Sequence, residues 1–283
     1  MDTLLNSAKK ITNFIILYFA FQVIYIAFDN AIYGGENNYQ LTTPYWILWY
    51  LLCYIFYLIL IPLLDFDILN KNSIIKMSCV ISFSLFMYFV FPFDSTQGYY
   101  LTVSRFVSFL PYFICGFYAK KSLSISNISL SKRKMIVVKI CFIILAIISA
   151  IVIIANKNIT QQMLYGSYPY KNLYNPLIKL ILLFCAISWI GFFTLTLRFN
   201  KKIPFITRIG GNTISIFLLH GFIIKGLDST DLFWNNKINI LLLILISVGI
   251  VILLGNIIME CFSKYILYGK LFEKRKRKEE SVD

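Results

Sequence analysis

Residues 238–260 read INILLLILISVGIVILLGNIIME, an apolar run whose single charged residue is the last one. A run of this length predicts a transmembrane helix, because a helix needs about 20 mostly apolar residues to cross a bilayer. Seven similar runs precede it, at 11–28, 44–64, 74–92, 103–119, 136–155, 176–197 and 209–225. The sequence therefore predicts an all-α, polytopic membrane helix bundle of about eight transmembrane helices.

The charge distribution predicts the orientation of this bundle. The chain has 27 Lys and Arg residues against 13 Asp and Glu, and 59% of its residues are hydrophobic. With the N-terminus inside, 21 of the 27 basic residues fall in cytoplasmic segments, a bias that is typical of membrane proteins. We therefore expect both termini in the cytoplasm and the lipid bilayer, not nucleic acid, as the partner of the basic patches. The expected organisation is a single membrane domain over 1–263 and a basic cytoplasmic tail over 264–283.

The cysteine and histidine content argues against a metal site. Five of the six cysteines lie in the apolar runs and Cys261 directly follows the last run, without a CxxC motif, and the chain has one histidine. We expect buried thiols, and neither a disulfide framework nor a metal centre.

Arg105 is the most prominent charge inside an expected span, in the stretch RFVSFLPYFICGFYAKK. Intramembrane charges are costly and mark candidate functional sites. At about 100° per residue, Ser108 and Tyr112 lie on the same helix face as Arg105, which indicates a polar pocket. The alternative is that the Arg105 side chain reaches the lipid headgroups at the outer face.

The second span opens with TTPYWILWYLL, in which Thr42 or Thr43 can cap the helix. Trp46 and Trp49 then lie near the outer interface. Two interpretations remain open for these rings, an aromatic belt at the membrane surface and stacking on a sugar. Tyr168, in the outer loop at 156–175, has the same two interpretations.

The stretch IGGNTISIFLLHGF at 209–222 contains the only histidine, His220. Counting along a straight helix from Ile209 places His220 about 16 Å into the membrane. Thr213 projects within about 20° of it and Asn212 about 80° away. The two preceding glycines predict either a close backbone approach or a break in the helix. His220 is a candidate general base or, in the interpretation we favour, a residue that positions substrate.

Three of these stretches, PYWILWYLL, RFVSFLPYFICGFYAKK and IGGNTISIFLLHGF, resemble in order and spacing the integral-membrane acyltransferase family 3, and within it the fucose 4-O-acetylase-like branch. The resemblance covers about residues 5–260. It implies O-acetyl transfer from acetyl-CoA, with no bound cofactor, to a sugar hydroxyl of a bacterial surface polysaccharide such as an O-antigen or capsule, at the inner membrane. The catalytic candidates are His220 and Arg105, and the substrate-binding candidates are Trp46, Trp49, Ser108, Tyr112, Tyr168, Asn212 and Thr213.

The N-terminal part departs from this family pattern. The family has about ten spans, with an arginine and a catalytic histidine in the first. The first run here, NFIILYFAFQVIYIAF, has neither and is similar to the family's third span. The resemblance thus implies that two N-terminal spans are missing. Such a chain is expected to be inactive alone, to act with a separately encoded N-terminal fragment, or to serve as a binding subunit.

Two other functional classes remain open. A polysaccharide polymerase or flippase-type membrane protein is also polytopic and rich in tyrosine. A polymerase usually has a large outer loop with several arginines, whereas the loop at 156–175 has none and two lysines. The other class is a non-catalytic membrane subunit.

The charge bias predicts the sides of the membrane on which two loops lie. A topology reporter fused after Ser229 should read as external, and one fused after Lys202 as cytoplasmic. The same side for both fusions would contradict the eight-span topology.

Overall fold

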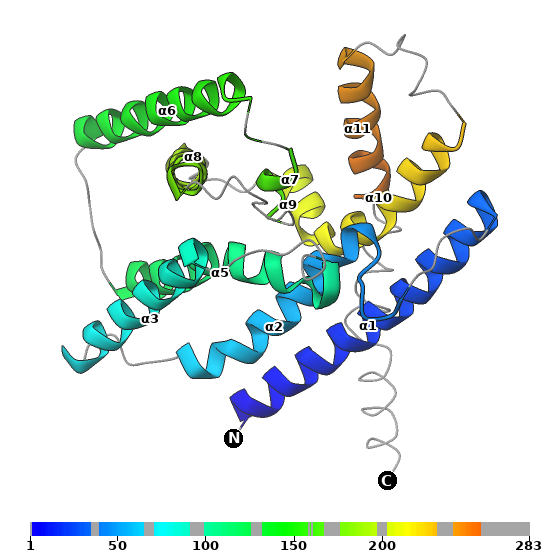
Figure 1. Cartoon of the computed structure of the whole chain (residues 1–283), viewed down its shortest axis with the longest axis horizontal. Coiled ribbons are helices and arrows are strands. Elements are labelled where there is room, and N and C mark those ends of the chain that lie inside the picture. The colour runs from blue at the N-terminus through cyan, green and yellow to red at the C-terminus, as the bar shows by residue number, and fades with distance from the viewer. Residues whose placement is uncertain are drawn as a thin grey trace. The chain divides into compact units, whose positions relative to one another are not determined.

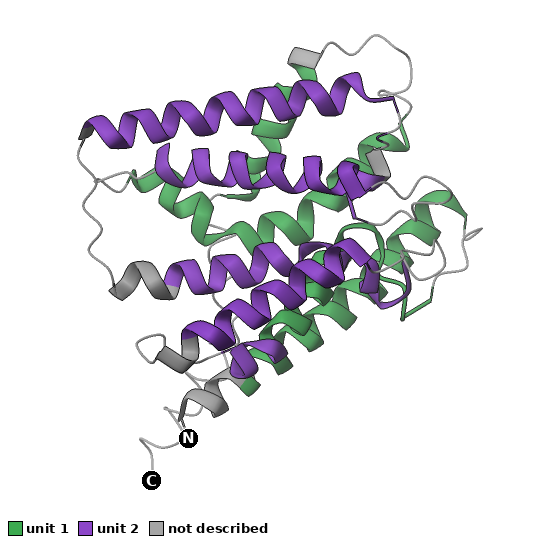
Figure 2. Cartoon of the chain, turned by 60° about the vertical axis from the view of Figure 1, so that its left-hand side comes forward, with its two compact units in different colours: residues 1–58, 201–283 green, residues 59–200 purple. Residues whose placement is uncertain are grey.

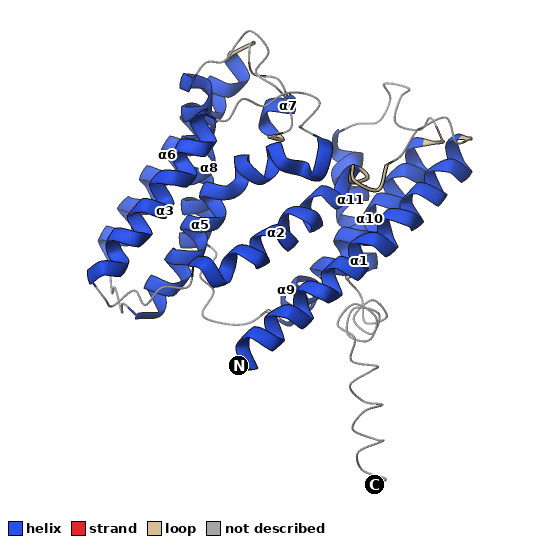
Figure 3. Ribbon diagram, turned by 60° about the horizontal axis from the view of Figure 1, so that its bottom comes forward, coloured by secondary structure: helices blue, strands red, loops and turns tan. Residues whose placement is uncertain are grey.

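The computed structural model describes residues 2–34, 40–64, 71–90, 99–125, 132–157, 159, 161–166, 176–196, 203–230 and 240–255. Every regular element in these ranges is a helix, which confirms the all-α prediction (Figure 3). The elements are α1 (Asp2–Tyr33), η1 (Trp46–Leu48), α2 (Trp49–Leu64), α3 (Lys71–Val90), η2 (Tyr100–Thr102), α5 (Val103–Ile125), α6 (Lys132–Ala155), α7 (Gln161–Leu164), α8 (Pro176–Thr196), α9 (Pro204–Gly211), α10 (Thr213–Asp228) and α11 (Ile240–Leu254).

Several helices are long and apolar enough to cross a membrane. Five segments in the described ranges pass this test, and the bent pair α9 and α10 would make a sixth; the five are Lys10–Tyr33, Trp46–Leu64, Tyr100–Lys120, Arg133–Ala155 and Pro176–Thr196. Shorter apolar helices cover Ile74–Val90 and Leu242–Leu254. Beyond Lys134, the exposed side chains of α6 are apolar, with Ile154 83% exposed, as expected for contact with lipid. The chain is therefore a multi-pass membrane protein, while the count of eight and the cytoplasmic termini stay predictions.

The helices form two compact units (Figure 2). The first unit comprises residues 1–58 and 201–283, and the second unit residues 59–200. In the first unit α10 contacts α1, η1, α9 and α11. In the second unit α3 packs against α5 and α6 packs against α8 (Figure 1).

Tyr25 of α1 lies at the centre of the first unit. The Tyr25 ring is fully buried and stacks on Phe222 and Tyr45, with ring centroids 4.0 and 5.1 Å apart. The Tyr25 hydroxyl donates a hydrogen bond to the carbonyl of Leu218 at 2.7 Å. A side chain on Gly221 would overlap this hydroxyl, so α10 approaches α1 closely only because residue 221 is glycine.

Gln22, one turn before Tyr25, holds the chain that leads into α2. The fully buried Gln22 amide donates to the carbonyl of Thr43 at 2.9 Å and accepts from the backbone N–H of Tyr45 at 2.9 Å. It also donates to the carbonyl of Gln40 at 3.3 Å. The expected N-cap at Thr42 or Thr43 is wrong. The helical segment begins at Trp46 after Tyr45, without a side-chain cap, and Gln22 holds the backbone just before it.

The expected span at 209–225 is not one straight helix. α9 ends at Gly211 and α10 begins at Thr213, with a bend of 72° between them. No other atom lies within 4 Å of a side chain built on Gly210 or Gly211, so of the two interpretations of these glycines the structure has the break. The depth of 16 Å for His220 assumed a straight helix and is wrong. Counted from Thr213, His220 lies about 10 Å along α10, near the middle of this helix.

Two glycines of α10 provide a matched test of the Tyr25 packing. Gly221→Ala should lower the free energy of unfolding by about 1–3 kcal/mol, because the new methyl group displaces the Tyr25 hydroxyl. Gly226→Ala should leave stability unchanged or raise it by at most about 1 kcal/mol, since no neighbour lies within 4 Å of the added carbon. Thermal unfolding of the detergent-solubilised variants measures both, and equal shifts would contradict this packing.

Candidate functional site

His220 lines a cavity of about 590 Å³ between α10 and α11. Thr213 and Phe217 of α10 line the same cavity, and the residues from α11 are apolar apart from Ser247. The Nδ1 atom of His220 lies 3.0 Å from the carbonyl oxygen of Ile216, one turn earlier. Because a carbonyl can only accept, this hydrogen bond requires the proton on Nδ1. In the neutral ring Nε2 is then the unprotonated nitrogen, and it can accept a hydrogen bond from a ligand hydroxyl.

Trp46 lies between His220 and a second cavity of about 740 Å³. The ring centroids of Trp46 and His220 are 6.5 Å apart, and the Trp46 side chain is 45% exposed. The second cavity is lined by polar and aromatic groups at the C-terminal end of α10 and before α2, namely Gln40, Thr43, Pro44, Tyr45, Trp46, Ile224, Lys225 and Asp228. Ile224 and Asp228 also line the His220 cavity. One continuous group of side chains therefore connects the histidine with a polar aromatic surface.

The polar groups around Trp46 are held by other aromatic rings. The ammonium of Lys225 lies 5.8 Å from the Trp46 ring and 5.3 Å from the ring of Tyr33. The Tyr33 hydroxyl donates to a carboxylate oxygen of Asp228 at 3.3 Å. An exposed indole ring beside an ammonium and a carboxylate can bind a sugar, because the apolar ring face packs on the indole and the hydroxyls bond to the charged groups.

The backbone of Trp46 is in the left-handed region, with a φ of 28°. Such a conformation is uncommon for a residue with a large side chain and indicates a position that the surrounding structure fixes. The preceding residue supplies that restraint. Tyr45 is buried, its N–H bonds to Gln22, and its hydroxyl donates to the buried carboxylate of Asp29 at 2.5 Å.

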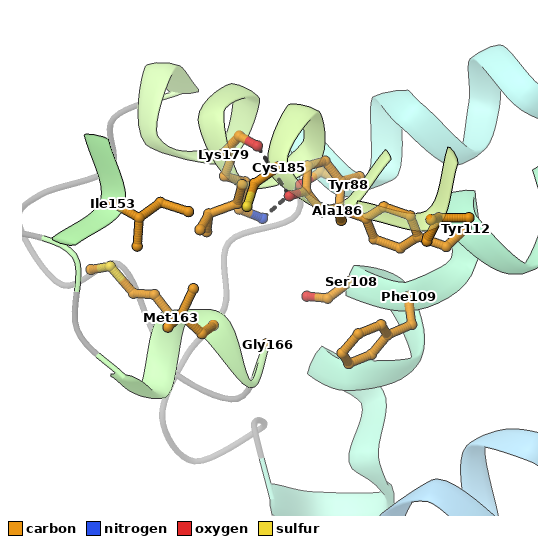
Figure 4. A pocket seen from close by; sticks show the side chains of 13 residues that line it. Tyr88, Ser108, Phe109, Tyr112, Ile153, Met163, Gly166, Lys179, Cys185 and Ala186 are labelled. Carbon is orange, nitrogen blue, oxygen red and sulfur yellow. Dashed lines mark hydrogen bonds between the residues drawn. The ribbon is translucent and has the colours of Figure 1, made fainter. Parts of the chain in front are cut away.

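A third cavity, of about 310 Å³, lies in the second unit and contains a buried lysine (Figure 4). Lys179 of α8 is 1% exposed. The Lys179 ammonium donates to the carbonyl of Tyr88 at 2.6 Å, and the Tyr88 hydroxyl donates to the carbonyl of Lys179 at 3.1 Å. This reciprocal pair joins α3 to α8. Ser108 and Tyr112 of α5 line the cavity with them.

The structure places the candidates from the sequence in both units. His220, Thr213 and Trp46 belong to the first unit and surround the cavities described above. Asn212 is buried at the break between α9 and α10, where its amide donates to the carbonyl of Gly255 at 3.4 Å. Trp49 is half-buried and packs edge-on against Tyr50, outside the lining of these cavities.

The remaining candidates lie in the second unit or outside the described residues. Ser108 and Tyr112 line the Lys179 cavity. Arg105 is half-buried at the third residue of α5, one turn before Ser108, and is not among the lining residues. Tyr168 and the tail at 264–283 lie outside the described ranges.

Sequence reasoning missed three residues that organise these cavities, namely Gln22, Asp29 and Lys179. The rule that polar groups within a span mark function drew attention to Arg105, and it applies equally to Gln22 and Lys179. Neither residue was recognised as a candidate, because Gln22 lies in an aromatic run and Lys179 lies close to the end of an expected span. Asp29 follows the expected first span at 11–28 and carried no signal of burial.

The sequence model of a family described as an acyltransferase domain, of the acyltransferase 3 type, matches residues 3–260. Searches of curated proteins and of solved structures found no significant match.

Proposed function

The chain belongs to acyltransferase family 3, and from this membership we propose that it is an O-acetyltransferase that modifies a sugar hydroxyl. The donor is acetyl-CoA, which is consumed as a substrate. The acceptor is a bacterial surface polysaccharide of the O-antigen or capsule type, and the protein acts in the inner membrane. Within the family we assign it to the fucose 4-O-acetylase-like branch.

The observation that carries this proposal is the exposed Trp46 ring beside His220. An acceptor sugar that stacks on Trp46 brings its ring into the cavity that Lys225 and Asp228 line. Its hydroxyls can bond to these two side chains, and a hydroxyl on the side of His220 can donate to Nε2. The site thus offers an apolar platform, a cation, an anion and a neutral acceptor, which together suit a carbohydrate.

His220 acts in this proposal as a positioning residue for the acceptor hydroxyl. In the transfer, the hydroxyl oxygen bonds to the carbonyl carbon of the acetyl thioester, the carbon–sulfur bond breaks, and the hydroxyl proton leaves with the CoA thiol. A hydrogen bond to Nε2 orients the attacking oxygen and increases its electron density, which favours attack.

The flippase class remains as a second candidate because of the break between α9 and α10. Broken helices in membrane proteins often line substrate paths, since unpaired backbone groups are tolerated only where they meet protein, ligand or water. A flippase or a non-catalytic subunit would bind the saccharide at Trp46 without acetylating it. Acetyl transfer therefore separates these classes.

Trp46 and Trp49 form a matched pair for this test. Membrane vesicles of the source cell also supply any separately encoded N-terminal fragment. When they receive radiolabelled acetyl-CoA and de-O-acetylated polysaccharide, the wild type should transfer label to the polysaccharide. Trp46→Ala should raise the KM for the acceptor by about tenfold or more, corresponding to about 1.4 kcal/mol of lost binding. Trp49→Ala, which removes a ring outside the cavity, should change KM by less than about twofold.

The outcomes distinguish the proposal from its alternatives. Equal losses in the two tryptophan variants would show that both rings serve as an interfacial belt. A second outcome is that the wild type binds the saccharide without transferring label, even when the membrane fraction of the source cell is present. This result would contradict the acetyltransferase proposal and favour a flippase or a binding subunit.

A further inference from the structure

All residues that line the Lys179 cavity belong to the second unit, and none of them belongs to the proposed sugar site. Figure 4 shows the Ser108 hydroxyl pointing into a space that Lys179, Cys185 and Met163 surround. The lining residues come from α3, α5, α6, α7 and α8 and from the turn after α7, and most are apolar, with Ile153, Leu182 and Ile190 among them. The cavity is thus a mainly apolar chamber with a few polar groups.

The polar groups of this chamber are biased toward donors. Its described lining contains an ammonium and the hydroxyls of Ser108, Tyr88 and Tyr112, and no carboxylate. The sequence has no Asp or Glu within α3, α5, α6, α7 or α8, the helices that supply the described lining. An ammonium in such surroundings attracts an oxygen that carries negative or partial negative charge, because the low dielectric leaves the interaction unscreened.

The turn after α7 forms one side of the chamber and packs closely on α5. Ser104 of α5 donates to the carbonyl of Gly166 at 2.8 Å, which ties this turn to α5. Gly166 has a φ of 65°, and a Cβ atom there would lie 2.9 Å from the Cβ atom of Ser108. The turn therefore approaches Ser108 as closely as a glycine allows.

The volume of about 310 Å³ limits the size of the occupant. It provides room for roughly ten water-sized groups, since a water molecule occupies about 30 Å³. An acetyl group fills a small part of this space. An acyl group with the adjoining part of its carrier, or an acyl chain of several carbons, fills it better.

We infer that this cavity binds an acyl group, with the acyl oxygen against Lys179 and the hydrocarbon against the apolar walls. The inference rests on the proposed function, in which an acyl thioester is the donor. A free short-chain carboxylate has the same combination of an oxygen and a hydrocarbon chain. The experiment therefore distinguishes a free carboxylate from an acyl thioester. Lys179 has the role of a binding residue that holds and polarises the acyl oxygen.

Cys185 allows this binding to be measured without an acceptor sugar, because its thiol lines the cavity. In the full chain, the other cysteines (Cys53, Cys79, Cys115, Cys141 and Cys261) are replaced by serine, and the rate of Cys185 alkylation by N-ethylmaleimide is followed by mass spectrometry. The probes are acetonyl-CoA, a ketone analogue that cannot transfer its acyl group, together with CoA and hexanoate. We expect saturable protection, by about fivefold or more, with acetonyl-CoA and little protection with CoA, which lacks the acyl oxygen.

Two variants and one control test the role of the chamber. Lys179→Met should remove the protection, and Ala186→Leu, which fills the cavity without changing its charge, should remove it as well. Lys157→Met replaces an exposed lysine of the same unit outside the cavity and should retain full protection. Thermal unfolding identifies any variant that has lost its fold. If Lys179→Met is unfolded, the Ala186→Leu result decides whether the inference holds.

Protection by acetonyl-CoA supports a thioester source, and protection by hexanoate alone supports a free carboxylate as the occupant. Absence of protection by both, equal protection by CoA, or protection that survives both Lys179→Met and Ala186→Leu would overturn the inference. Label transfer to polysaccharide without Cys185 protection would overturn it while leaving the proposed function intact. Cys185 protection without any transfer would contradict the proposed function alone.

Discussion

A polar side chain buried among membrane helices has to find its hydrogen-bond partners within the protein, because lipid offers none. Gln22 shows how much this constraint determines in the first unit. Its amide bonds to three backbone groups of the segment 40–45 and so fixes the chain that precedes α2. The position of Trp46 follows from this, since Tyr45 is held both by Gln22 and by the buried carboxylate of Asp29. The exposed ring beside His220 is thus the result of a buried network around α1.

The same constraint gives the second unit its pocket. Lys179 and Tyr88 exchange hydrogen bonds through side chain and backbone, which joins α3 to α8 and holds an ammonium at the edge of an apolar cavity. A pair of hydrophobic side chains could join α3 and α8 equally well. Lys179 is the group of this cavity to which we assign the oxygen of the bound acyl group.

Much of the fold could be predicted because helices in membranes have a simple signature, and each of the eight apolar runs overlaps a helix of the structure. Hydropathy could not predict the bend of 72° at Asn212, since both sides of the break are apolar and only the glycine pair signals it. The Thr42 or Thr43 cap failed for a different reason, namely that the helical segment starts later, at Trp46, after a stretch that the sequence-distant Gln22 holds. Local sequence likewise indicated Trp46 and His220 but not their proximity, which depends on tertiary contacts between η1 and α10.

The central claim is that His220 presents an unprotonated Nε2 to the acceptor, because its Nδ1 proton is engaged by the carbonyl of Ile216. His220 is the only histidine of the chain, so ¹⁵N-histidine labelling gives a spectrum with the two ring nitrogens of this residue alone. In lipid nanodiscs, at a pH at which the ring is neutral, we expect a protonated-type Nδ1 resonance and an unprotonated-type Nε2 resonance. The acceptor saccharide should shift the Nε2 resonance. A proton on Nε2, or rapid averaging between the two tautomers, would contradict the account.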